Sequence, residues 1–95
     1  MSPKKNKELN NLRKKLDIID NKLLKIIKIR TSIVKQVLKL KNSKNQIVDK
    51  KRIKIILKRI RKKSLIMRID PKIKNHIWKN MIKSYIDYER RNFKK

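Results

Sequence analysis

The chain contains no cysteine and no glycine, and it has a single histidine, His76. The lack of cysteine excludes disulfides, thiolate metal sites and thiol nucleophiles. The lack of glycine excludes the glycine-rich loops that cradle phosphate groups in nucleotide-binding proteins. His76 falls at helical spacing with Lys72, Lys79 and Lys83, which is typical of a solvated helix face rather than of a metal site or a Ser/His/Asp triad. We therefore expect neither a metal ion nor a cofactor.

Long apolar segments are also missing from the sequence. No run of residues approaches the ~18 apolar residues of a membrane-spanning helix. The N-terminus is basic, but the apolar segment of a signal peptide does not follow it. The sequence therefore predicts a soluble, cytoplasmic protein with no membrane partner.

Three periodic segments predict an all-α fold, because the chain has only two prolines to interrupt its helices. A length of 95 residues suits one domain spanning residues 1–95. Residues 1–7 are polar and basic, and we expect them to form a disordered lead-in in which Pro3 delays the first helix. A chain this short buries only a modest core, so dimerisation would help its stability.

The first helix is predicted over residues 9–41 from an apolar seam that repeats at alternating steps of three and four residues. The apolar members of this seam are Leu9, Leu12, Leu16, Ile19, Leu23, Ile26, Ile33, Val37 and Leu40. At ~1.5 Å per residue such a helix is about 50 Å long, whereas a compact monomer of this size has a radius of gyration near 13 Å. We therefore expect the helix to cross into a second subunit and form an intertwined helical homodimer.

Two shorter helices complete the predicted chain, which then has one long, one short and one medium helix. Asp49 is a good N-cap residue, and an amphipathic stripe follows it over residues 53–60. Asp70 and Pro71 form a cap followed by proline at the first helical position. The apolar stripe of this third helix covers residues 78–93.

Several charged residues fall at positions that face the predicted interior. Arg13, Arg30 and Lys41 lie on or beside the buried side of the first helix. Arg52 occupies the first turn of the second helix, where a cation opposes the helix dipole. Glu89 lies in line with the apolar stripe of the third helix, and a carboxyl there must be paired or protonated.

These inward charges predict a pocket for a small molecule that carries two carboxylates. Arginine is suited to bidentate carboxylate recognition. Arg30 and Lys41 are separated by about 16 Å along one helix, so they can flank one small site. Arg13 lies roughly 25 Å from Arg30, so an antiparallel partner chain would have to supply it. No nucleophile accompanies these residues, and any chemistry would depend on positioning and electrostatics.

The net charge of +25 also suggests nucleic acid, because clustered lysines bind phosphate backbones. However, the abundant lysine (24 residues) and isoleucine (17 residues) both have codons made of A and T alone. We assign the surface charge to that bias and do not expect a nucleic-acid partner. One alternative is a basic nucleic-acid-binding module, which explains neither Arg30 in the seam nor Glu89 on an apolar stripe. Another is a coiled coil in which Arg30 sets the register.

The placement of these residues resembles the AroQ class of chorismate mutase, which is all-helical. The resemblance covers about residues 8–93 and involves Leu12-Arg13, Ile19-Asp20, Leu23-Leu24, Arg30, Val37, Lys41, the segment 47–52, Ile69-Asp70, Ile77-Trp78 and Glu89. It implies an intertwined dimer of three-helix chains that rearranges chorismate to prephenate. It also implies two active sites, each completed by an arginine from the other subunit.

The resemblance implies a role for each of the inward cations. Arg13 from the partner subunit, Arg30 and Arg52 would hold the carboxylates of the substrate. Lys41 would donate to the ether oxygen of the bond that breaks. Because the reaction is pericyclic, it needs no acid, base or covalent intermediate, and cations would stabilise the charge that develops on that oxygen.

Two further residues match the family pattern and two depart from it. Glu89 would be the second donor to the ether oxygen, which requires its protonated form, and Asp49 would lie near the substrate hydroxyl. Ile53 stands where the mutases usually have glutamate, and Tyr85 stands where they usually have serine in contact with the substrate. Both departures resemble isochorismate-pyruvate lyase, the salicylate-forming enzyme on the same scaffold. Glu89 favours the mutase, and we retain the lyase as the alternative.

Overall fold

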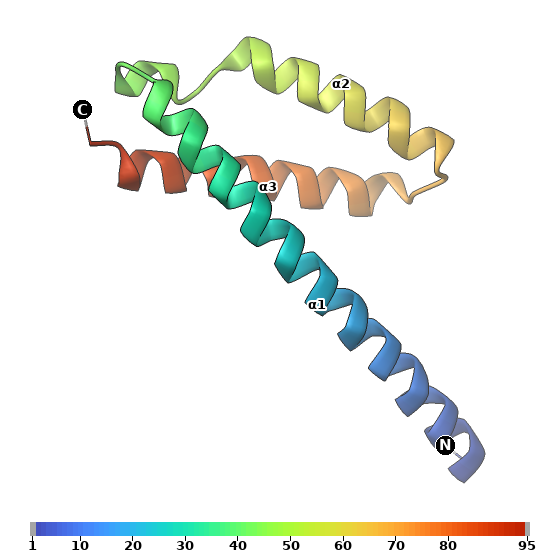
Figure 1. Cartoon of the computed structure of the whole chain (residues 1–95). Coiled ribbons are helices and arrows are strands. Elements are labelled where there is room, and N and C mark those ends of the chain that lie inside the picture. Colours follow the sequence, from blue (N-terminus) through green and yellow to red (C-terminus); the bar gives the residue numbers. More distant parts are fainter. Residues whose placement is uncertain (1, 95) are drawn as a thin grey trace. The chain divides into compact units, whose positions relative to one another are not determined.

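The structure is a computed structural model that describes residues 2–94, and all of its regular elements are helical (Figure 1). The long helix α1 spans Pro3–Leu40, a short 3-10 helix η1 spans Lys44–Gln46, α2 spans Lys50–Ile66 and α3 spans Pro71–Asn92. The prediction of an all-α chain with one long, one short and one medium helix is confirmed. The chain forms two compact units, residues 1–33 and residues 34–95, and α1 contributes to both.

The start of α1 differs from the sequence prediction. The helix begins at Pro3, so the expected disordered lead-in is wrong for residues 3–7, which form its first turns. Proline is tolerated there because the first helical N–H has no intrahelical acceptor. The Ser2 hydroxyl accepts the backbone N–H of Lys5 at 3.2 Å, as an N-cap residue does. Ser2 and Pro3 together were therefore a helix-start signal.

The caps of α2 and α3 lie where the sequence placed them. Asp49 accepts the backbone N–H of Arg52 at 2.9 Å, and Asp70 accepts that of Ile73 at 3.0 Å. Each carboxylate satisfies one of the N–H groups that a helix leaves without a partner at its start. Both helices belong to the second unit, where they lie side by side and are joined by a short turn (Figure 1).

The core of the second unit is small. Among residues 2–94 only two hydrophobic side chains are buried, Leu38 near the end of α1 and Ile47 after η1. The polar side chains of Ser64 and Glu89 are buried with exposed fractions of 6% and 7%. The Ser64 hydroxyl donates to the backbone carbonyl of Arg61 at 3.0 Å, so its burial is compensated.

The turn between α2 and α3 contains a residue in the left-handed region. Arg68 has φ 55, the single positive φ in the described part of the chain. The N–H of Ile69 donates to the carbonyl of Ser64 at 3.0 Å, and the N–H of Arg68 donates to that of Leu65 at 3.2 Å. This pair of hydrogen bonds is the Schellman motif, in which glycine usually takes the position that Arg68 holds here.

We expect Arg68→Gly to stabilise the fold. The left-handed conformation costs a residue with a Cβ about 1–2 kcal/mol, and the greater freedom of glycine in the unfolded chain returns about 0.4–1 kcal/mol of that. The net gain should be roughly 0.5–1 kcal/mol, visible as a rise of a few degrees in the Tm followed by circular dichroism at fixed protein concentration. Arg68→Ala keeps the Cβ and should give no such rise. Equal Tm values for the two variants would contradict this account of the turn.

Candidate functional site

Lys41 lies directly after the last residue of α1 and points toward α3. Its backbone N–H donates to the carbonyl of Leu38 at 3.1 Å, which fixes the direction in which the chain leaves the helix. Its ammonium group donates to Glu89 Oε1 at 2.9 Å and lies 3.5 Å from the carbonyl oxygen of Ile47. The end of α1 and the end of α3, far apart in sequence, therefore meet at the Lys41 ammonium group.

Glu89 lies in the last turns of α3 and forms an ion pair with Lys41. The side chains are largely withdrawn from solvent, with exposed fractions of 18% for Lys41 and 9% for Glu89. The sequence required this carboxyl to be paired or protonated, and the structure shows it paired. A buried ion pair of this kind is sensitive to the loss of either partner, because the remaining charge is then buried without compensation.

A groove of about 670 Å³ opens beside Lys41 in the same unit. Its lining residues are Val37, Leu40, Lys41, Asn45, Gln46, Val48, Asp49 and Lys50. The volume is within the range of small-molecule sites, and the lining combines apolar side chains with a few polar ones. Two of the predicted site residues, Lys41 and Asp49, therefore line one groove.

The wall of this groove formed by η1 is held by Gln46. The Gln46 side chain accepts the backbone N–H of Asn42 at 2.5 Å and that of Ser43 at 3.3 Å. Ser43 and Gln46 form a capping box around η1. The sequence analysis described this segment only as a polar turn, although a serine followed three residues later by glutamine was a signal for the motif.

The remaining predicted residues of the second unit have different surroundings. Asp49 is the N-cap of α2, so one carboxylate oxygen is engaged by a backbone N–H and the other is available to the groove. The side chain of Arg52 is exposed. Tyr85 is half-buried one turn before Glu89, and its ring meets that of Tyr88 edge to face at 6.5 Å and 74°.

Arg13 and Arg30 belong to the first unit, on α1. Arg13 is exposed and Arg30 is half-buried. The apolar residues of the seam around them remain about half exposed in the single chain, with exposed fractions of 49% to 59% for Leu12, Leu16, Ile19, Leu23, Ile26 and Ile33. The structure brings together Lys41, Glu89 and Asp49 within the second unit, and the joint site with Arg13, Arg30 and Arg52 stays a prediction.

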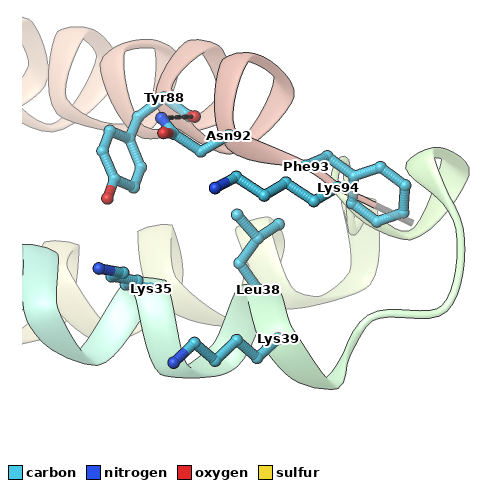
Figure 2. A pocket seen from close by; sticks show the side chains of 7 residues that line it. All are labelled: Lys35, Leu38, Lys39, Tyr88, Asn92, Phe93 and Lys94. Carbon is cyan, nitrogen blue, oxygen red and sulfur yellow. Dashed lines mark hydrogen bonds between the residues drawn. The ribbon is translucent and has the colours of Figure 1, made fainter.

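A second, smaller cavity of about 240 Å³ lies between the end of α1 and the end of α3 (Figure 2). It is lined by Lys35, Leu38, Lys39, Tyr88, Asn92, Phe93 and Lys94. The Asn92 side chain donates to the Tyr88 carbonyl at 2.8 Å, which closes the last turn of α3. None of the predicted site residues lines this cavity.

The sequence of this chain matches a known protein family. The family model described as chorismate mutase type II matches residues 12–90, which is most of the chain. The chain belongs to this family. A curated relative named chorismate mutase, from Methanocaldococcus jannaschii, is 48% identical over 56 residues, or 58% of this chain. The aligned part covers 57% of that relative, little more than half of its length.

Three further results concern the relation of this chain to known proteins. No solved structure matches it at a significant level. The resemblance to the mutase family inferred from the spacing of Arg13, Arg30, Lys41 and Glu89 is confirmed by the family match, which includes all four positions. The comparisons do not favour the isochorismate-pyruvate lyase alternative.

Two features of other protein classes are absent from residues 2–94. Within residues 2–94 no helix combines the length and the hydrophobicity that crossing a bilayer requires. The same residues hold no group of three His, Cys, Asp or Glu side chains placed to share a metal ion.

Proposed function

We propose that this protein is a chorismate mutase, which rearranges chorismate to prephenate. Membership of the family supports the reaction, and the contact of Lys41 with Glu89 beside a groove also lined by Asp49 is the observation that carries it. Chorismate is a dianion, and in this proposal Arg13, Arg30 and Arg52 would supply the cations that hold its two carboxylates. The expectation of a cytoplasmic location stays a prediction.

Catalysis in this proposal depends on electrostatics and on the bound shape of the substrate. The groove holds the enolpyruvyl arm over the ring, which converts a flexible molecule into one that is ready to react. Negative charge develops on the ether oxygen in the transition state, and Lys41 donates to that oxygen. The bond to Glu89 keeps the ammonium group in position before the substrate arrives.

The proposed active unit is a homodimer. The apolar seam of residues 12–33 is about half exposed in the single chain, and burying it against a second copy would remove a continuous apolar stripe from water. An antiparallel partner helix would also deliver Arg13 to the site of the neighbouring subunit. Each dimer would then contain two sites, each composed of residues from both chains.

A substrate assay tests the reaction directly. The purified protein is offered chorismate and isochorismate in separate reactions, and prephenate, salicylate and pyruvate are measured. We expect prephenate from chorismate and no salicylate. Formation of salicylate and pyruvate from isochorismate, with no prephenate from chorismate, would replace the mutase with the lyase. Absence of turnover with both substrates would overturn the enzymatic proposal.

Glu89 can be tested as a second donor to the ether oxygen by replacing it with an amide. The Glu89 carboxylate accepts from Lys41 in the structure, whereas the amide of glutamine can also donate. Glu89→Gln should therefore keep kcat close to that of the unchanged protein, and Glu89→Ala, which has no donor, should lower it. The measurement is kcat for both variants at one pH. Equal loss of kcat in the two variants would restrict Glu89 to holding Lys41.

A further inference from the structure

Helix α2 carries more positive charge than the proposed enzyme uses, which is Arg52 for the substrate and Lys50 in the lining of the groove beside Lys41. Nine of its 17 residues are lysine or arginine and none is acidic, while the seven acidic residues of the chain all lie outside it. Composition explains why tolerant positions are lysine, but it does not explain the arrangement of these cations on one helix. The helix also has no acidic residue in its first turn, where Lys50, Lys51 and Arg52 oppose the helix dipole.

Six of the nine cations form one continuous face, which we call the basic stripe. At about 100° per residue they fall within an arc of about 120°, and they extend over about 18 Å of the helix. The basic stripe consists of Lys50, Lys51, Lys54, Lys58, Arg61 and Lys62. Every one of these residues is exposed, and no ion pair engages any of them within residues 2–94.

The opposite face of α2 is committed to packing. Ile53, Ile56 and Ile60 are half-buried, Ser64 is buried, and the helix contacts α3. The basic stripe therefore lies on the side of α2 away from these buried and half-buried residues. Lys50, Lys54, Lys58 and Lys62 follow one another at steps of four residues, and like charges at this spacing destabilise an isolated helix.

We propose that the basic stripe of α2 binds the phosphate backbone of duplex nucleic acid. A polyanion laid along the stripe would neutralise the repulsion between neighbouring cations and release counterions from its own backbone. Phosphates repeat at ~3.4 Å of rise along each strand, so a stripe of about 18 Å spans several of them. This proposal departs from the expectation from composition that nucleic acid is no partner. The proposal does not depend on the mutase activity.

Two features of α2 favour a duplex over the other anionic partners. A helix that lies in a membrane surface inserts its apolar face, but Ile53, Ile56 and Ile60 of α2 are already half-buried and the helix contacts α3. Binding of single strands commonly uses aromatic side chains on which bases stack, and residues 50–66 include none. The stripe therefore matches sequence-independent contact with a backbone of regular geometry.

The test compares the whole protein with a variant that removes the centre of the stripe. Binding of a short labelled duplex is followed by fluorescence anisotropy as DNA and as RNA, with the single strand and with vesicles containing anionic lipid as further probes. For about six phosphate contacts, affinity should fall about 10³-fold between roughly 50 and 200 mM salt. The variant Lys54→Gln/Lys58→Gln/Lys62→Gln should reduce the slope of log affinity against log salt by about 3.

A matched control removes the same charge from another helix of the same unit. Lys72→Gln/Lys79→Gln/Lys83→Gln takes three exposed lysines from one line on α3, and it should leave the salt slope close to that of the unchanged protein. Replacing the three stripe lysines with arginine should also preserve the slope, because the positive charge is kept. This variant distinguishes a loss of binding caused by the missing charge from one caused by a damaged fold. Turnover of chorismate should be unchanged in all three variants.

Several results would overturn the proposal. Equal loss of binding in the stripe and α3 variants would show that net charge alone attracts the duplex. Stronger binding to anionic vesicles than to duplexes would assign the stripe to a membrane surface, and a preference for the single strand would contradict backbone recognition of a duplex. Undetectable duplex binding by the unchanged protein at about 50 mM salt would show that the basic stripe is not a duplex-binding site.

Discussion

Mixing two inactive variants should restore about a quarter of the wild-type activity if the active sites are shared between subunits. The variants are Arg13→Ala and Arg52→Ala, and each alone should lose on the order of 10²-fold or more in kcat/KM, because a substrate carboxylate loses its cation. In a random mixture about half of the dimers contain one chain of each kind, and one of their two sites has both arginines. The measurement is the mutase rate after the two proteins are unfolded and refolded together.

A double variant provides the matched control for this experiment. Arg13→Ala/Arg52→Ala mixed with Arg13→Ala yields heterodimers in which no site contains both arginines, so no activity should return. Both side chains are exposed in the single chain, and neither substitution should prevent folding. Heterodimers seen by mass spectrometry in the first mixture, with activity no higher than in the control, would show that Arg13 acts in its own subunit or not at all.

The ends of the helices could be predicted because their signals are local. Asp49 and Asp70 cap α2 and α3 with hydrogen bonds to residues three positions later. Ser2 and Pro3 carried the same kind of signal for α1, which the sequence analysis missed because it took the beginning of the apolar seam as the beginning of the helix. Arg68 could not have been predicted, since its left-handed conformation is normally indicated by glycine or asparagine.

The residues of the candidate site could be predicted from the sequence, but the contacts between them could not. Periodicity placed Lys41 and Glu89 on inward faces of two helices, and the contact between them, 48 positions apart, depends on how those helices pack. The sequence left open whether Glu89 was paired or protonated for the same reason. The groove wall formed by Asn45 and Gln46 was also missed, because a short polar segment has no periodicity from which a wall could be predicted.

Removing the proposed catalytic cation should affect both rate and stability. Lys41→Ala should lower kcat on the order of 10²- to 10³-fold, because a donor to the developing charge on the ether oxygen is lost. It should also destabilise the fold by about 3–5 kcal/mol at most, because Glu89 is then left buried without its partner. Steady-state kinetics and denaturant unfolding measure the two effects. Lys39→Ala removes a cation from the same end of α1, where it lines the other cavity, and should leave kcat unchanged.

The two effects of Lys41 can be separated with a second substitution. In Lys41→Ala/Glu89→Gln the buried carboxylate is replaced by a neutral amide, so much of the lost stability should return. The rate should stay low, because no cation faces the ether oxygen. Recovery of stability without recovery of kcat would show that Lys41 contributes to catalysis as well as to the stability of the fold. If kcat recovered together with stability, the defect of Lys41→Ala would be structural, and the electrostatic role of this lysine would have to be abandoned.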